Sequence, residues 1–147
     1  MILLTKDPLQ PEALQAQFAA GATGAGAVAT FTGIVRQEGE QGVEALFIDH
    51  AAGLTEREIE RAAAEAKARW PLVDLAIVHR VGRIKAGEPV VFVATASAHR
   101  RAAFESCDFL VDFLKTDAPF WKQEISRTGG RWIEPTGKDY TDRDRWR

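Results

Sequence analysis

The 147-residue sequence predicts one α+β domain with antiparallel sheets and two main helices. Three observations indicate this class. The length fits a single domain of about 100–200 residues, two segments have the apolar periodicity of amphipathic helices, and strand-like segments come in pairs between the helical ones. Paired strands favour antiparallel connections, whereas single strands alternating with helices would favour a parallel sheet. We therefore expect residues 1–147 to form one domain.

The first part of the chain is predicted to contain a short helix and two strands. Pro11 suits the first turn of a helix, and the glycines from Gly21 onward end it. Residues 27–36 are rich in β-branched side chains and predict a strand, and a second strand is expected near residues 43–50. The polar residues 37–42 between them include two glycines and predict a mobile loop.

The clearest helix is predicted from Thr55 to Trp70. Thr55 and Glu58 have the spacing of a capping box, and Pro71 disfavours helical geometry at the residue before it. One apolar face follows the helical period. It consists of Ile59, Ala62, Ala63, Ala66 and Trp70.

Two strands, at residues 72–79 and 89–98, lead to the second long helix, at about residues 100–115. Its apolar stripe has helical spacing. The stripe is predicted to be Phe104, Cys107, Val111 and Leu114. A hairpin is expected over residues 120–134. The polar tail at residues 135–147 is expected to be partly mobile unless a partner orders it.

Composition excludes several kinds of protein. The single cysteine, Cys107, excludes an internal disulfide and a multi-cysteine metal site, and its place on the apolar stripe favours a small core residue over a reactive thiol. The three histidines lack metal-binding spacing, so no metal site or cofactor is predicted. No apolar run approaches the roughly 20 residues of a membrane span, and no signal-peptide pattern opens the chain, so a cytoplasmic protein is expected.

The net charge of -2 does not favour a nucleic-acid-binding protein. The charge is unevenly distributed along the chain. Residues 1–60 carry three basic and nine acidic side chains, a net -6, and residues 61–147 carry a net +4. The basic part is where an anionic ligand is expected, with an ordinary solvated surface as the alternative.

A candidate anion site lies where the second long helix begins. His99, Arg100 and Arg101 directly follow a strand. Free N–H groups at a helix N-terminus attract anions, and arginines add bidentate donors. A merely solvated surface is the alternative, but basic side chains here are slightly unfavourable against the helix dipole. We therefore favour an anion site.

Lys115 and Lys122 flank the turn that follows the same helix. If the turn brings both amines to one cleft, each ammonium group lowers the pKa of the other, and burial lowers it further. A lysine tuned in this way transfers protons or acts as a nucleophile near neutral pH. The alternative for Lys115 is a favourable contact with the C-terminal end of the helix dipole.

Around these residues the chain resembles the large, catalytic subunits of molybdopterin synthase (the MoaE family). The resemblance covers roughly residues 27–134, and the order of its motifs makes it specific. The motifs are Thr30-Phe-Thr-Gly33-Ile-Val-Arg36, Arg69-Trp-Pro71, His79-Arg-Val-Gly82, Ser97-Ala-His-Arg100, Ala102-Ala-Phe104, Asp112-Phe-Leu-Lys115, Ala118-Pro-Phe-Trp-Lys122-Gln-Glu124 and Arg131-Trp-Ile-Glu134.

The resemblance implies a hammerhead-type α+β fold and sulfur transfer in molybdenum-cofactor biosynthesis. In this family the substrate is a cyclic pyranopterin monophosphate, which receives two sulfurs and becomes the dithiolene of molybdopterin. The sulfur comes from a thiocarboxylate on the C-terminal Gly-Gly of a small ubiquitin-like partner subunit. Two large subunits form a homodimer with a small subunit at each end, which makes a heterotetramer.

The same resemblance implies roles for the candidate residues above. Lys115 and Lys122 match two catalytic lysines, which activate the thiocarboxylate and transfer protons. His99 and Arg100 match the pocket for the phosphate of the pterin. Both substrates are anionic, so a locally basic cleft in an acidic protein is the expected electrostatic arrangement.

Further substrate contacts are implied on two short segments. Arg36 matches a substrate contact, together with the backbone of Ile34 and Val35. Gln123 and Glu124 match the last binding stretch. Family members often carry a second basic residue where this chain has Gln123, so the backbone is the contact expected there.

Two other kinds of function remain open. A regulatory module that binds a phosphorylated metabolite without turnover would explain His99 and Arg100, but it would give Lys115 and Lys122 no shared task. An RNA-binding domain would use the basic second half and the tryptophans, but the net acidity of the chain argues against it.

Overall fold

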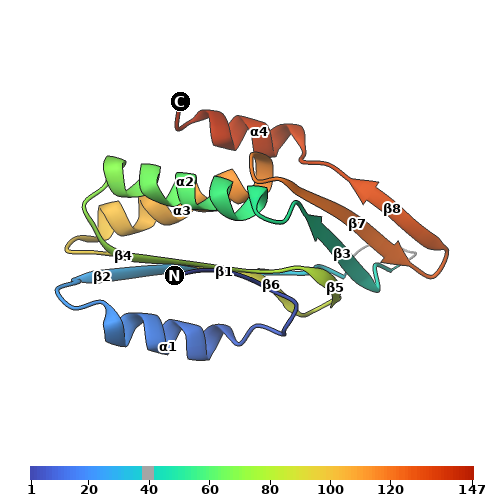
Figure 1. The fold of residues 1–147 in the computed structure, drawn as a ribbon, viewed down its shortest axis with the longest axis horizontal. Coiled ribbons are helices and arrows are strands. Elements are labelled where there is room, and N and C mark those ends of the chain that lie inside the picture. Colours follow the sequence, from blue (N-terminus) through green and yellow to red (C-terminus); the bar gives the residue numbers. More distant parts are fainter. Residues whose placement is uncertain (38–41) are drawn as a thin grey trace.

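The computed structural model describes residues 1–37 and 42–147, which form two four-stranded sheets and four helices (Figure 1). Residues 38–41, in the loop predicted between the first two strands, lie outside the described residues. The predicted α+β class, with antiparallel-rich sheets and two main helices, is confirmed. Within the described ranges, no helix has the length and apolar character needed to span a membrane.

The first sheet has the strand order β1-β4-β6-β2. β1 runs parallel to β4, whereas the β4–β6 and β6–β2 pairs are antiparallel. The strands are β1 (Ile2–Thr5), β4 (Leu72–Arg80), β6 (Pro89–Ser97) and β2 (Ala27–Ile34).

The second sheet has the order β5-β3-β7-β8 and is antiparallel throughout. Its strands are β5 (Gly82–Lys85), β3 (Ala45–His50), β7 (Phe120–Ser126) and β8 (Gly129–Ile133). It extends from one end of the first sheet (Figure 1).

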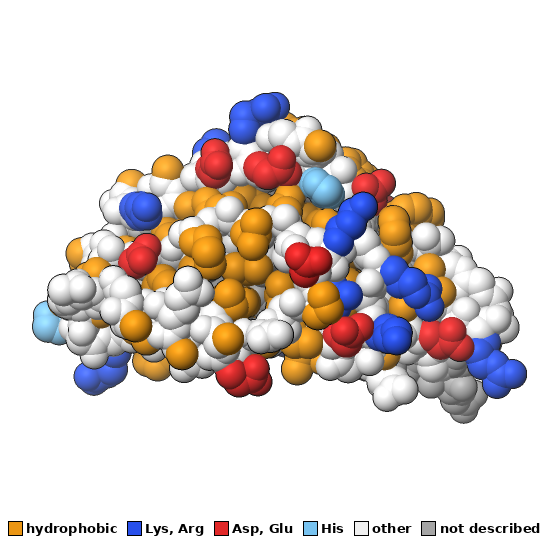
Figure 2. Space-filling view, turned by 60° about the horizontal axis from the view of Figure 1, so that its bottom comes forward, with side chains coloured by type: hydrophobic (Ala, Val, Ile, Leu, Met, Phe, Trp, Pro, Cys, Tyr) orange, Lys and Arg blue, Asp and Glu red, His pale blue; other side chains and the backbone are white. Residues whose placement is uncertain are grey.

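Helices cover both faces of the first sheet. α1 (Pro11–Gly21) lies on one face, and α2 (Leu54–Arg69) and α3 (Arg100–Thr116) lie on the other (Figure 1). α4 (Gly137–Asp144) lies against α3 on the side away from the sheet. On the face that carries α1, hydrophobic side chains gather in the middle, and Lys and Arg side chains gather toward the end with the second sheet (Figure 2).

Successive residues of β4 point to opposite faces of the first sheet and therefore belong to two separate parts of the core. Leu75 and Ile77 pack against α2 and α3, whereas Ala76 and Val78 pack on the α1 side. A third buried cluster joins the two sheets. It contains Val35, Ile48, Val81 and Ile84. This third cluster matters for function because it lies directly beside the candidate catalytic residues.

The capping residues predicted for the start of α2 are wrong. Gly53 is the N-cap residue at φ 85°, and its N–H donates to the Glu56 carboxylate at 2.7 Å. Thr55 is fully buried, and its hydroxyl donates to the carbonyl of Pro119 at 2.9 Å. The expected capping box of Thr55 with Glu58 is therefore absent, and Thr55 instead ties α2 to the turn before β7.

The apolar stripe of α3 is confirmed in part. Cys107 and Leu114 are buried as predicted, but Phe104 is 65% exposed. Ala103 and Leu110 complete the buried face at the spacing of one helix stripe. Burial raises the pKa of the Cys107 thiol to about 12, as expected for a small core residue and not for a reactive thiol.

Three elements are present that the sequence did not predict. β1 and β5 are four-residue strands, and β5 occupies the predicted turn between the strands at 72–79 and 89–98. α4 forms within the segment that was expected to be a partly mobile tail. Its position next to α3 brings the C-terminal residues close to the candidate site.

Candidate functional site

Lys115 and Lys122 lie on either side of the turn between α3 and β7. Lys115 is exposed in the last turn of α3. Lys122 lies opposite Ile48 in the register of β3 and β7, and Ile48 is only 1% exposed. Lys122 therefore points to the buried face of this sheet, and Trp121 points to the other face, where it is 51% exposed.

The two lysines are close enough to interact electrostatically. The pKa of Lys122 is lowered from 10.5 to about 8, mainly by burial and then by the positive charge of Lys115, while the carboxylate of Asp139 raises it. The predicted coupling between the two amines is therefore confirmed for Lys122. An amine with a pKa near 8 supplies both a protonated and a neutral fraction close to neutral pH.

β4 brings His79 next to this lysine pair. The residue is 3% exposed, and its ring stacks on Phe120 with a centroid distance of 4.2 Å and an interplanar angle of 21°. The pKa of His79 is lowered to about 3, mainly by burial; the hydrogen bond to the backbone of Arg80 opposes this shift, and the charges of Lys122 and Lys115 add to it. The imidazole is therefore neutral near pH 7.

The tautomer of His79 follows from its contact with the chain. Its Nδ1 lies 2.8 Å from the carbonyl oxygen of Arg80, so Nδ1–H donates to that oxygen and Nε2 is an acceptor. His79 belongs to one of the motifs quoted above but was not predicted as a site residue. The signal available in the sequence was a single histidine at the end of a strongly apolar strand.

His50 and Glu56 form a second polar pair beside the stack. His50 is the register partner of Phe120, and its Nε2 lies 3.9 Å from Oε1 of Glu56. That Glu56 oxygen is buried and has no hydrogen-bond partner among the described residues. Across the same ranges, no group of three or more His, Cys, Asp and Glu side chains could hold a metal ion.

The end of β2 also reaches this part of the molecule. Val35 is buried in the same cluster as Ile48, the register partner of Lys122. Ile34 is 57% exposed, and Arg36 is exposed. The segment that the sequence predicts as a substrate contact therefore lies beside the lysine pair.

Gln123 and Glu124 point in opposite directions because they are adjacent on β7. Glu124 lies on the same face as Lys122, and its carboxylate accepts a hydrogen bond from Arg131 of β8 at 3.1 Å. The side chain of Gln123 lies on the other face. Of the two side chains, only that of Glu124 lies on the face of the second sheet to which Lys122 points.

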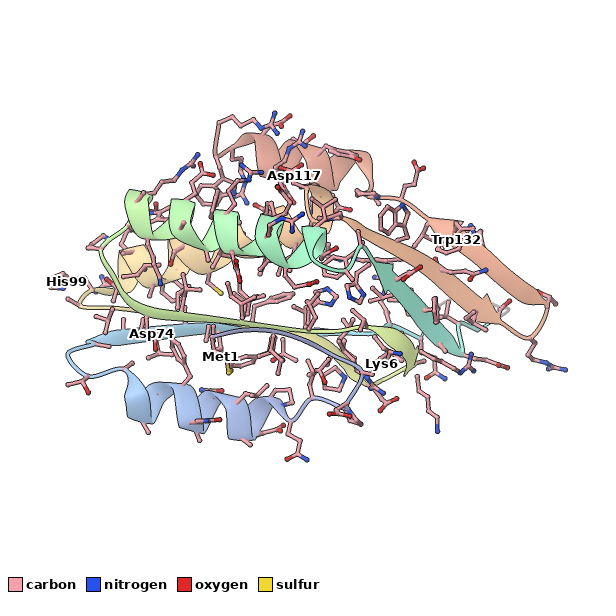
Figure 3. All side chains as sticks on the ribbon, in the orientation of Figure 1. Met1, Lys6, Asp74, His99, Asp117 and Trp132 are labelled. Carbon is pink, nitrogen blue, oxygen red and sulfur yellow. The ribbon has the colours of Figure 1, made fainter. Side chains whose placement is uncertain are left out.

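His99 and Arg100 lie far from the lysine pair within one chain. His99 is the N-cap residue of α3, Arg100 is the first residue of that helix, and both are exposed. Lys115 is in the last turn of the same helix, about 24 Å away at a rise of 1.5 Å per residue. Figure 3 shows His99 at one end of the molecule and Trp132 at the other.

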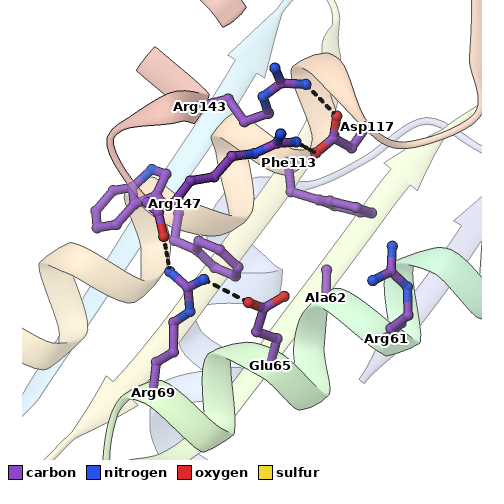
Figure 4. Close-up of a pocket in the computed structure, with 10 residues that line it drawn as sticks. Arg61, Ala62, Glu65, Arg69, Phe113, Asp117, Arg143 and Arg147 are labelled. Atoms are coloured by element: carbon purple, nitrogen blue, oxygen red, sulfur yellow. Dashed lines mark hydrogen bonds and ion pairs between the residues drawn. The ribbon is translucent and has the colours of Figure 1, made fainter. Parts of the chain in front are cut away.

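A pocket with a volume of about 200 Å³ lies between α2, α3 and α4 (Figure 4). Arginines line much of it, but carboxylates already pair with them: Arg143 lies 2.8 Å from Asp117, and Arg69 lies 2.7 Å from Glu65. The pocket follows the line where α4 packs on the two long helices. We therefore attribute it to the docking of α4 and place the candidate chemistry at the lysine pair.

Comparisons with known proteins match most or all of the chain. A family model described as MoaE protein matches residues 4–117. The molybdopterin synthase catalytic subunit of Caulobacter vibrioides is 50% identical over 146 residues, which cover 99% of this chain and 97% of that protein. The chain is thus similar to that protein along almost its whole length, and the similar region extends beyond the residues that the family model matches.

Solved structures give the same result. The molybdopterin biosynthesis MoaE protein from Burkholderia ambifaria has a TM-score of 0.83 and 42% identity, covering 99% of this chain and 97% of that one. A chain in a protein–protein complex of subunits 1 and 2 of the molybdopterin-converting factor from Helicobacter pylori has a TM-score of 0.74 and 25% identity, covering 93% and 91%. The fold described above is therefore that of these proteins.

Proposed function

The chain belongs to the MoaE protein family, and on that basis we propose that it is the catalytic subunit of a molybdopterin synthase, a sulfur-transferring enzyme. Within the structure, the observation that supports this proposal is that Lys115 and Lys122 lie close together at the turn between α3 and β7. One of these amines has a pKa near 8, which suits proton transfer close to neutral pH. A protein that only binds a ligand would need no amine with a lowered pKa.

In the proposed reaction, sulfur passes from the thiocarboxylate of a small ubiquitin-like subunit ending in Gly-Gly to a cyclic pyranopterin monophosphate. The ammonium groups of Lys115 and Lys122 attract the anionic thiocarboxylate, and the neutral fraction of Lys122 accepts protons released during transfer. Arg36 contacts the pterin together with the backbone of Ile34 and Val35, at the end of β2. Gln123 contributes through its backbone because its side chain points away.

We also propose that two copies of the chain form a homodimer within a heterotetramer. His99 and Arg100 are expected to bind the phosphate at the N-terminus of α3, where the first turn carries no acidic residue. Because they lie about 24 Å from Lys115 in one chain, they meet a lysine pair only if a second copy supplies them. The Helicobacter pylori neighbour, a complex of two subunits, supports a small-subunit partner.

The test is a reconstituted assay with a thiocarboxylated small subunit and the pterin substrate. Lys115→Ala is expected to lower molybdopterin formation by about 10²–10³-fold, the usual range for losing one group that stabilises the charge of the reacting atoms, while binding of the small subunit is retained. Cys107→Ala is the matched control and keeps its turnover, because the thiol is buried and the partner brings the sulfur.

Near-normal turnover of Lys115→Ala would contradict the assignment of that lysine. Pterin binding without any product by the unsubstituted chain and its partner would favour the regulatory module instead.

A further inference from the structure

Asp139, in the first turn of α4, is a charged residue near the lysine pair that the proposed function does not use. Its carboxylate accepts a hydrogen bond from the backbone N–H of Thr136 at 2.8 Å. In return, the N–H of Asp139 donates to Oγ1 of Thr136 at 3.2 Å. This reciprocal capping pair holds the carboxylate at the N-terminal end of α4.

Two structural constraints place that end of α4 near Lys122. First, β8 pairs with β7 so that Ile133 lies opposite Lys122, and Thr136 follows only three residues later. Second, Arg143 of α4 lies 2.8 Å from Asp117, which is two residues beyond Lys115. The helix is therefore tied to the same turn that carries the lysine pair.

The C-terminal end of α4 is held as firmly as its start. Asp112, on the buried side of α3, accepts hydrogen bonds from Nε1 of Trp146 at 2.7 Å and from Arg145 at 2.8 Å. With both ends anchored, the helix holds its first turn, and the carboxylate of Asp139, in a defined position.

Several other titratable groups surround Lys122. Lys115 approaches from α3, and His79 from β4 is neutral. Glu124, two residues along β7, pairs with Arg131 of β8 at 3.1 Å. His50 from β3 lies opposite Phe120, with its Nε2 3.9 Å from Oε1 of Glu56. The carboxylate of Asp139 raises the pKa of Lys122, opposing the charge of Lys115.

We propose that Asp139 is a positioning residue for sulfur transfer, whose carboxylate, held at the start of α4 by its cap with Thr136, offsets one positive charge of the lysine pair. This inference rests on the proposed function of the lysine pair. The physical reason is that two ammonium groups repel each other and that the positive end of the α4 dipole adds to the repulsion. A carboxylate in the first turn counters both, so that Lys122 can hold a proton as well as release it.

The matched variants change the charge without changing the helix cap. Asp139→Asn keeps an oxygen that accepts the Thr136 N–H and removes the charge. Asp139→Glu keeps the charge and a residue type suited to this capping position. Asp142→Asn removes the same charge from the same helix and is the control for net charge.

The first measurement uses the chain alone, so it does not depend on the reaction. The rate at which an acylating reagent modifies Lys122 is followed against pH by peptide mass spectrometry. We expect the midpoint near pH 8 to move to lower pH in Asp139→Asn and to stay in place in Asp139→Glu and Asp142→Asn. The shift should shrink in 1 M salt, where the screening length is about 3 Å. An unchanged midpoint in Asp139→Asn overturns the proposal.

The second measurement is the pH dependence of turnover in the reconstituted enzyme. In Asp139→Asn, the limb that reports Lys122 is expected to move to lower pH in step with the acylation midpoint, with small-subunit binding unchanged. If the acylation midpoint moves but the pH profile of turnover does not, the role of Lys122 in the reaction is wrong. In that case the proposed function of the lysine pair fails, although Asp139 still acts on the charge of Lys122.

Discussion

Lys122 extends its amine toward a buried face of the second sheet, beside another amine. Burial and the charge of Lys115 both disfavour the ammonium form, which is why its pKa falls to about 8. Such an arrangement lowers the stability of the folded chain at neutral pH. A lysine at this position is therefore better explained by chemistry than by folding.

We expect Lys122→Met to raise the free energy of unfolding at pH 7 by about 1–3 kcal/mol, less than the full pKa shift implies because solvent screens a partly exposed side chain. Below pH 8 the Lys122 amine is protonated in both the folded and the unfolded wild-type chain, so the stability gained by Lys122→Met does not change with pH. Between pH 8 and about 10.4 the unfolded chain binds more protons, so wild-type stability rises and the gain shrinks.

Urea unfolding at several pH values measures this difference. Lys67→Met, at an exposed position of α2, is the control and should change stability by less than about 0.5 kcal/mol. A gain for Lys122→Met that stays constant up to pH 10.5 would contradict the depressed pKa.

Part of the candidate site follows from residue order alone. The spacing of Lys115 and Lys122 across a short turn allows both amines to reach one cleft, and in the folded chain the charge of Lys115 lowers the pKa of Lys122. His79 and Asp139 could not be found in this way, because β4 and α4 reach the lysine pair only after the sheets and helices have packed. No local pattern around either residue indicates its distant neighbours.

Among the elements, the two long helices and β7 are predictable because apolar periodicity marks them over many residues. β1 and β5 span four residues each, too few for a reliable period. α4 has no buried residue, so it lacks the apolar stripe that identifies a helix. Its attachment depends instead on ion pairs and on Trp146, which are contacts with α3 and α2.

The start of α2 gives a prediction at the scale of an element. Gly53 adopts φ 85°, a conformation that disfavours any residue with a Cβ, although there is room for one. We expect Gly53→Ala to lower the free energy of unfolding by about 1–2 kcal/mol. Gly21→Ala, at the end of α1 with open space around it, should be neutral or stabilising by up to about 1 kcal/mol.

Urea unfolding of the two variants under the same conditions measures both changes in the free energy of unfolding. Equal effects of Gly53→Ala and Gly21→Ala would show that the backbone conformation at Gly53 does not limit the start of α2.

In the whole molecule, Asp112 anchors the C-terminal segment by accepting hydrogen bonds from Arg145 and Trp146. We expect Asp112→Ala to lower the free energy of unfolding by about 1–3 kcal/mol, because Arg145 and the Trp146 indole lose a nearly buried acceptor. Asp108→Ala removes only an exposed partner of Arg145 and should cost less than about 1 kcal/mol.

Hydrogen exchange locates the effect of these variants. In Asp112→Ala, the exchange rates of the α4 amides should increase more than those of the α3 amides, because α4 is held by contacts near its two ends. Unchanged protection of α4 would mean that Asp112 does not hold it.

The sequence by itself determined the α+β class, the long helices, the family and the lysine pair, because periodicity, turn residues and motifs act over short stretches of chain. Only the tertiary structure decided that His79 and Asp139 join the lysine pair, that the side chain of Gln123 points away, and that His99 lies at the far end of α3. Strand register and helix packing set these relations between residues distant in sequence, and they depend on the whole core forming at once.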